Sequence, residues 1–145
     1  MNQVFLDKEP LDLALSAISK AGMKMLFREP FYAHVLSGIN REINTSIPTA
    51  CIGISDDSVT IGVNPDFFCK KLGEHYQVGV LKHELLHLIF GHLQAQNKNP
   101  KKLFNIAADL VVNQYLHPWP VPEGAVTLDL FKDLTLIPYE SVEYI

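Results

Sequence analysis

The segment from about Gln77 to Leu93 constrains the fold of this chain more than any other feature. It contains the run VGVLKHELLHLIFGHL, in which apolar residues fall on nearly every side of an α-helix. Such a helix is usually buried, and burying charged or imidazole groups without partners is costly. We therefore expect a buried helix over residues 77–93 whose histidines and acidic residue have a defined chemical role.

The polar residues of this helix form an H-E-x-x-H motif, with His83, Glu84 and His87 at its fixed positions. Four residues turn an α-helix by about 400°, so the two imidazoles lie roughly 40° apart on one face. Their ring nitrogens can then bind one Zn²⁺ ion. Glu84 projects about 100° away from His83, which suits a general base acting on a metal-held water better than a ligand. Coincidental histidines on a solvated helix are the structural alternative.

A catalytic zinc ion needs a third protein ligand and one open position. Asp109 is the favoured ligand, because it stands among apolar residues in NIAADLVVNQ, and a buried acid needs a cation or hydrogen-bond donors. His92 is the alternative ligand. In a continuous helix it points about 180° from His83, so it can join the site only if Gly91 breaks the helix. A plain surface position for Asp109 also stays open.

Two asparagines repeat the spacing of Asp109 on the same predicted helix. Asn105, Asp109 and Asn113 are each four residues apart and form one polar stripe. The asparagines are candidates to orient Asp109 or a metal-bound histidine through hydrogen bonds. An ordinary solvated helix face explains the stripe equally well.

The rest of the chain predicts an α+β fold that is mostly helical, in one domain over residues 1–145. Prolines suit the first turns of two helices in a helical N-terminal part (1–45), and β-branched runs on either side of Asp56-Asp57 suit a hairpin. An unpaired strand edge can hold an extended peptide, and SVTIGV is the strand expected beside the cleft. The predicted elements are helices 10–27, 30–43, 66–72, 77–93 and 103–116, strands 50–55 and 58–63, and a tail 117–145.

Composition narrows the classes of partner. Hydrophobic residues make up 48% of the chain, enough for a real core, and the net charge of -4 with scattered basic residues argues against nucleic acid or an anionic membrane. No apolar stretch reaches the length of a membrane span, and the N-terminus lacks the pattern of a secretory signal. Two cysteines make no disulfide framework, so the sequence predicts a cytoplasmic protein.

The order of a strand, Asn64-Pro65, a short helix, the H-E-x-x-H helix and then NIAADLVVNQ resembles a known family. It is the metallopeptidase domain found ahead of a von Willebrand factor A-like domain in bacterial and phage proteins. The resemblance covers nearly the whole chain, and NIAAD-x-x-x-N is its most specific part. A metzincin would carry a histidine or aspartate where Leu93 stands. The matching segments are REPFYAHVLSGI (28–39), IGVNPDFF (61–68), LKHELLHLIFGH (81–92), NIAADLVVNQYL (105–116) and the closing SVEYI.

This resemblance implies a zincin-like core, zinc ligation by His83, His87 and Asp109, and Glu84 as the general base. It also implies a peptide or protein substrate, although the family takes its name from the motif alone. No von Willebrand module fits within 145 residues, and a protein partner stays open. The alternative to an enzyme is a non-catalytic zinc module, in which a fourth protein ligand such as His92 closes the metal site.

Overall fold

The computed structural model describes residues 10–93 and 101–142; residues 1–9, 94–100 and 143–145, the last including the end of SVEYI, lie outside the described part. Its architecture confirms the predicted α+β class, mostly helical with a small sheet ahead of the H-E-x-x-H helix. Its elements are the helices α1 (Pro10–Arg28), α2 (Pro30–Ser37), α3 (Gln77–Ile89) and α4 (Lys101–Asn113), the strands β1 (Asn40–Ile43), β2 (Ala50–Ser55) and β3 (Ser58–Val63), and short helical turns at Phe67–Lys71, Glu74–Tyr76 and Leu128–Phe131.

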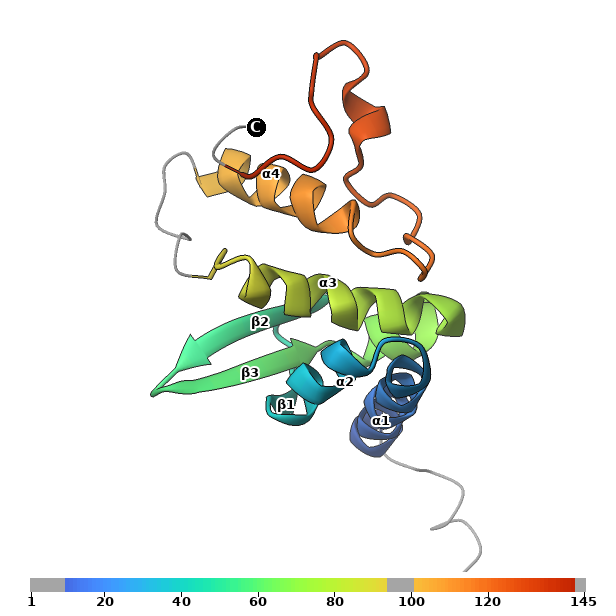
Figure 1. Ribbon diagram of the computed structural model, residues 1–145. Coiled ribbons are helices and arrows are strands. Elements are labelled where there is room, and N and C mark those ends of the chain that lie inside the picture. Colours follow the sequence, from blue (N-terminus) through green and yellow to red (C-terminus); the bar gives the residue numbers. More distant parts are fainter. Residues whose placement is uncertain (1–9, 94–100, 143–145) are drawn as a thin grey trace, which may run out of the picture.

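Helix α3 occupies the middle of the molecule. The sheet, α1 and α2 lie on one side of it, and α4 lies on the other (Figure 1). Leu81 and Leu85 of α3 belong to the main core, which also contains residues of α1, α2 and the strands. Leu86 instead packs with Val112 and Leu116 at the α4 side. Leucines on both sides of this helix therefore have packing partners, as the sequence predicted, whereas Ile89 at its end is 42% exposed.

The predicted hairpin is confirmed at both of its strands. Strands β2 and β3 pair antiparallel, from Ala50 opposite Val63 to Ser55 opposite Ser58. The turn between them uses Asp56 and Asp57, with φ of 49° and 64°. Positive φ at both central residues matches the right-handed twist of the strands, and aspartate tolerates that region better than most residues. A glycine is therefore not needed here.

The second predicted helix, 30–43, is wrong in its last part. Helix α2 ends at Ser37, and Asn40–Ile43 forms strand β1, parallel to Thr60–Val63 of β3. Ile39 and Ile43 have the spacing of a helix. The segment forms a strand instead, because its hydrogen bonds to β3, which is distant in sequence, stabilise the extended conformation. The helical N-terminal part predicted for residues 1–45 therefore contains a strand.

The strand order β1-β3-β2 also changes which strand borders the cleft. The sequence placed SVTIGV there, yet that strand is β3, which lies between the other two and uses both of its edges. Strand β2 is the edge strand that contacts α3. Sheet order is set by long-range pairing, which hairpin spacing does not reveal.

Helix α3 ends before the predicted residue 93. The N–H of Gly91 donates to the carbonyl of Leu88, and that of His92 to the carbonyl of His87, at 3.1 and 2.9 Å. Gly91 has φ of 74°. These bonds form a Schellman motif, which requires a left-handed residue that glycine adopts at little cost. The next helix is shifted too: α4 spans Lys101–Asn113, where 103–116 was predicted.

A buried ion pair on α3 anchors the chain after α4. Lys82 is 2% exposed, and its Nζ lies 2.9 Å from both carboxylate oxygens of Glu29 and 3.0 Å from the carbonyl of His117. The indole N–H of Trp119 donates to the same carboxylate. At Gly79, a Cβ atom would lie 2.9 Å from the carbonyl of Pro120. The segment after α4 therefore crosses α3 at close range.

None of the helices in the described ranges combines the length and the apolar character that crossing a membrane requires.

Candidate metal centre

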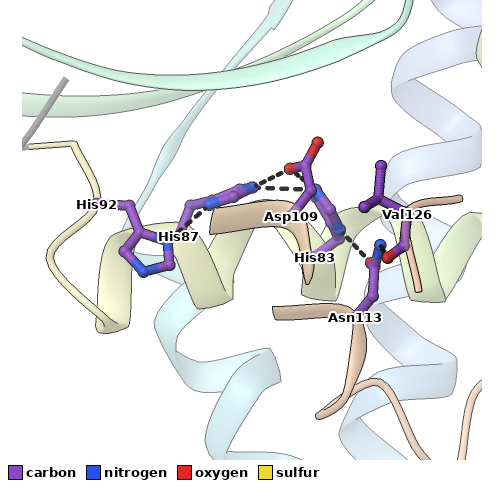
Figure 2. Close-up of polar contacts among 6 residues, drawn as sticks. All are labelled: His83, His87, His92, Asp109, Asn113 and Val126. Atoms are coloured by element: carbon purple, nitrogen blue, oxygen red, sulfur yellow. Dashed lines mark hydrogen bonds and ion pairs between the residues drawn. The ribbon is translucent and has the colours of Figure 1, made fainter. Parts of the chain in front are cut away.

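Three side-chain atoms from α3 and α4 that could bind a metal ion converge on one point. The Nε2 atom of His87 lies 3.0 Å from Nε2 of His83 and 3.0 Å from Oδ1 of Asp109, and the remaining His83–Asp109 distance is 3.2 Å (Figure 2). His83 and His87 share a face because they are one helical turn apart. Asp109 reaches them because α4 packs against α3.

The spacing of these atoms fits a divalent metal ion. Three ligands of a tetrahedral zinc at about 2.0–2.1 Å lie roughly 3.3 Å from one another. The three distances observed are 3.0, 3.0 and 3.2 Å. Two imidazole nitrogens and one carboxylate oxygen are also a donor set that zinc accepts. Of the residues in the described ranges, His83, His87 and Asp109 form the group suited to hold a metal ion.

Asn113 determines which nitrogen of His83 carries the proton. Its amide nitrogen donates to the carbonyl of Val126 at 2.8 Å, so its oxygen is the atom that faces Nδ1 of His83, at 2.7 Å (Figure 2). An amide oxygen only accepts hydrogen bonds, and therefore Nδ1 carries the proton. In the neutral ring, Nε2 then offers a lone pair to the site, as a metal ligand must.

His92 contacts His87 on the side of the ring that faces away from the other ligand atoms. The two Nδ1 atoms are 2.9 Å apart, whereas Nε2 of His87 points to His83 and Asp109. Gly91 ends the helix, which is the condition that the sequence set for His92 to approach the site. The structure brings His92 next to His87, a candidate ligand, rather than into the group of three converging atoms.

Glu84 lines one cavity together with His87 and Asp109 and another together with His83 and Asp109. Burial raises the pKa of Glu84 to about 7; the positive charge of His83 opposes this effect and the negative charge of Asp109 adds to it. A carboxyl group with a pKa close to neutrality exchanges protons readily at physiological pH.

His83 and Asp109 shift each other's pKa in opposite directions. Burial acts to lower the pKa of His83, but its hydrogen bond with Asp109 and the negative charge of Glu84 reverse this and raise that pKa. Burial acts to raise the pKa of Asp109, yet the hydrogen bonds and positive charge of His83 and His87 hold it well below its usual range. Asp109 therefore stays anionic, which favours a bound cation.

Two cavities flank the convergent atoms. The first, of about 290 Å³, is lined by Glu84, His87 and His92 with α4 and part of β2. The second, of about 280 Å³, is lined by His83 and Glu84 together with residues 122–126. Because Glu84 lines both, a ligand that fills the two cavities would pass directly over the site.

The two asparagines that the sequence proposed as partners of the site lie in different places. Asn113 contacts His83, whereas Asn105 is exposed and lines the first cavity. The sequence did not identify the carbonyl of Val126 as a partner of Asn113, because any residue type can supply a backbone carbonyl. It also did not identify residues 122–126 as a cavity wall, since that wall forms only when the segment packs near α3. Gly91 near the end of a predicted helix was the available signal for the turn that places His92.

A search of curated proteins and a search of solved structures found no match to the chain. A comparison with protein families found one whose description is "Putative metallopeptidase domain", and the match extends over residues 15–139 of 145. The matched range contains every residue of the site described above. The chain therefore belongs to this family of metallopeptidase domains.

Proposed function

We propose that this chain is a zinc-dependent peptidase domain in which Glu84 is the general base. The observation that carries the proposal is the convergence of His83, His87 and Asp109 within hydrogen-bond distance, with Glu84 beside them and a cavity on either side. A structural zinc site has no need of a non-ligating acid next to open space. The family to which the chain belongs supports the same reaction class.

Three protein ligands are the number expected for a catalytic zinc site, which keeps one position for water or substrate. A zinc ion held by His83, His87 and Asp109 would supply a Lewis acid and lower the pKa of a bound water toward neutrality. His92 contacts Nδ1 of His87 and does not belong to the group of three residues that could hold a metal ion, which supports a site with three protein ligands.

Glu84 would transfer protons between water and the leaving group. Its carboxylate would take a proton from the attacking water and then donate it to the amine nitrogen released when the peptide bond breaks. Without a metal ion, burial raises the pKa of Glu84 to about 7. A zinc ion beside it would lower that pKa and favour the carboxylate that accepts the proton.

The outer edge of β2 would hold the substrate backbone. Ala50, Cys51 and Ile52 of this strand line the first cavity, and Ala50 also lines the second. Within the described residues, β2 pairs with β3 alone, so its other edge faces the site. An extended peptide can add to such an edge through backbone hydrogen bonds. This assignment replaces the earlier expectation for SVTIGV.

The variant Glu84→Gln tests the proposal. The amide has nearly the shape of the acid but cannot accept the proton, so zinc content should stay stoichiometric while hydrolysis of a mixed peptide library falls by about 10²–10⁴-fold. Elemental analysis and mass spectrometry of the products measure the two effects. The variant His83→Ala is the control that should lose both metal and cleavage.

Undiminished cleavage by Glu84→Gln would contradict the role of the general base. Stoichiometric zinc with no cleavage by the wild type would instead favour the non-catalytic zinc module.

A further inference from the structure

The two cavities beside the metal centre differ in chemistry, and this difference bears on the substrate class of the proposed peptidase. Ala50, Glu84 and Asp109 line both cavities, so the cavities are two sides of one site. We call the one bordered by residues 122–126 the apolar cavity and the one bordered by His92 the polar cavity. A peptide whose scissile bond lies at the centre would place neighbouring side chains on opposite sides.

The walls of the apolar cavity are mainly hydrocarbon, and its volume is about 280 Å³. They combine core residues with the segment after α4, which the Lys82–Glu29 pair and the close approach at Gly79 hold against α3. The polar cavity has His87, His92 and Asn105 in its wall instead. The apolar wall residues are Phe67, Val80, Leu116, Pro122, Ala125 and Val126.

The side-chain amide of Asn113, which lines the apolar cavity, is already paired. Both polar atoms of the Asn113 amide have partners, one in His83 and one in the carbonyl of Val126. An apolar side chain that covers this amide would therefore leave no unsatisfied donor or acceptor on it.

Charge in the same cavity disfavours one kind of side chain. Glu84, Asp109 and the exposed Glu123 all line it. Burying an ionised side chain against the apolar wall is costly, and Glu123 adds repulsion, so an acidic substrate residue should be rejected. A basic side chain could pair with Glu123, but exposed ion pairs contribute little.

We propose that the apolar cavity is a specificity pocket that selects peptides with an aliphatic or aromatic residue next to the scissile bond and rejects acidic residues there. This proposal rests on the proposed function and names its substrate class. Burying a leucine-sized side chain in such a pocket should strengthen binding at least about 10-fold over glycine.

Binding of peptide hydroxamates to the zinc-loaded protein tests the proposal without relying on turnover. Two probe series carry leucine, glycine, aspartate or lysine on either side of the hydroxamate group, and calorimetry measures each affinity. In one series, leucine should bind at least about 10-fold more tightly than glycine, and aspartate most weakly. The variant Ala125→Phe should reduce the leucine preference to under about 3-fold, because it fills the pocket.

Val121→Phe is the matched control, since Val121 is 37% exposed in the same segment and does not line the cavity. It should keep the leucine preference of the wild type. Ala125→Leu is a second filling variant in case the phenylalanine disturbs folding, and zinc content and melting temperature are measured for every variant.

Equal affinity for leucine and glycine in both series, or a preference that survives both substitutions of Ala125, would overturn the pocket assignment and leave the proposed function standing. A preference for lysine over leucine would also overturn it, in favour of recognition through Glu123. Failure of every probe to bind the zinc-loaded protein would overturn the proposed function together with the pocket.

Discussion

The Nδ1 atom of His83 lies 2.7 Å from the side-chain oxygen of Asn113. The other end of the same amide holds the carbonyl of Val126. One side chain thereby links a candidate metal ligand to the segment that forms the wall of the apolar cavity. Partners of this kind fix both the protonation and the orientation of a ligand histidine.

We expect Asn113→Ala to weaken zinc binding by about 10–100-fold, because the His83 ring loses the acceptor that fixes its Nδ1 proton. Competition with a chromophoric chelator measures the affinity. Asn113→Asp, which keeps an acceptor oxygen, should recover part of the loss. Asn105→Ala is the control from the same stripe, and an equal loss in that variant would show that the His83 contact has no special role.

Removal of the metal should destabilise the folded chain. With free zinc at about 100 times its dissociation constant, binding adds about 2.7 kcal/mol of stability, and this corresponds to roughly 5–10 °C in melting temperature for a chain of this size. Thermal unfolding before and after dialysis against a chelator measures the shift. The double variant His83→Ala/His87→Ala should melt at the same temperature with and without zinc; a zinc-dependent shift in that variant would place the metal elsewhere.

Glu84 gives the metal-free protein a specific dependence on pH. Because its folded pKa of about 7 lies above the ordinary value of 4.5, the fold favours the protonated acid, and this stabilisation is lost as pH rises through that interval. The raised pKa of His83 likewise lowers the stability of the fold as pH rises above 6.5. Relative to the wild type, metal-free Glu84→Gln should therefore become more stable from pH 4.5 to 7, by on the order of 1–3 kcal/mol.

Denaturant unfolding at half-unit steps of pH measures this difference. The low pKa of Asp109 has its effect below pH 3.8, outside the interval. A difference that stays constant between pH 4.5 and 7 would show that Glu84 is not held protonated by burial.

The buried pair of Lys82 and Glu29 should matter for stability. Among the residues that the structure describes, Lys82→Met leaves the mostly buried carboxylate of Glu29 with the indole of Trp119 as its donor, so we expect a loss of about 3 kcal/mol in the free energy of unfolding. The exposed i,i+4 pair of Lys70 and Asp66 is the control, and Lys70→Ala should cost no more than about 0.5 kcal/mol. Equal losses would mean that burial adds nothing to the first pair.

Local periodicity determined the parts of this protein that depend on neighbouring residues in sequence. The apolar pattern of α3 predicted a buried helix, and the i,i+4 spacing of His83 and His87 put both rings on one face. The β-branched runs beside Asp56 and Asp57 predicted the hairpin strands at their observed residues. The sequence also indicated that Gly91 could end the helix, because a left-handed C-terminal turn favours glycine.

Tertiary structure alone decided the features that depend on distant segments. Strand β1 exists because β3 offers it a parallel partner, although its own sequence fits a helix. Asn105 and Asn113 have the same spacing from Asp109, yet only packing of α4 on α3 brings one of them to His83 and leaves the other at the cavity wall. The wall formed by residues 122–126 follows from the way the tail crosses α3. These outcomes have one physical reason: the free energy that selects them comes from contacts between segments far apart in the chain, which no local pattern records.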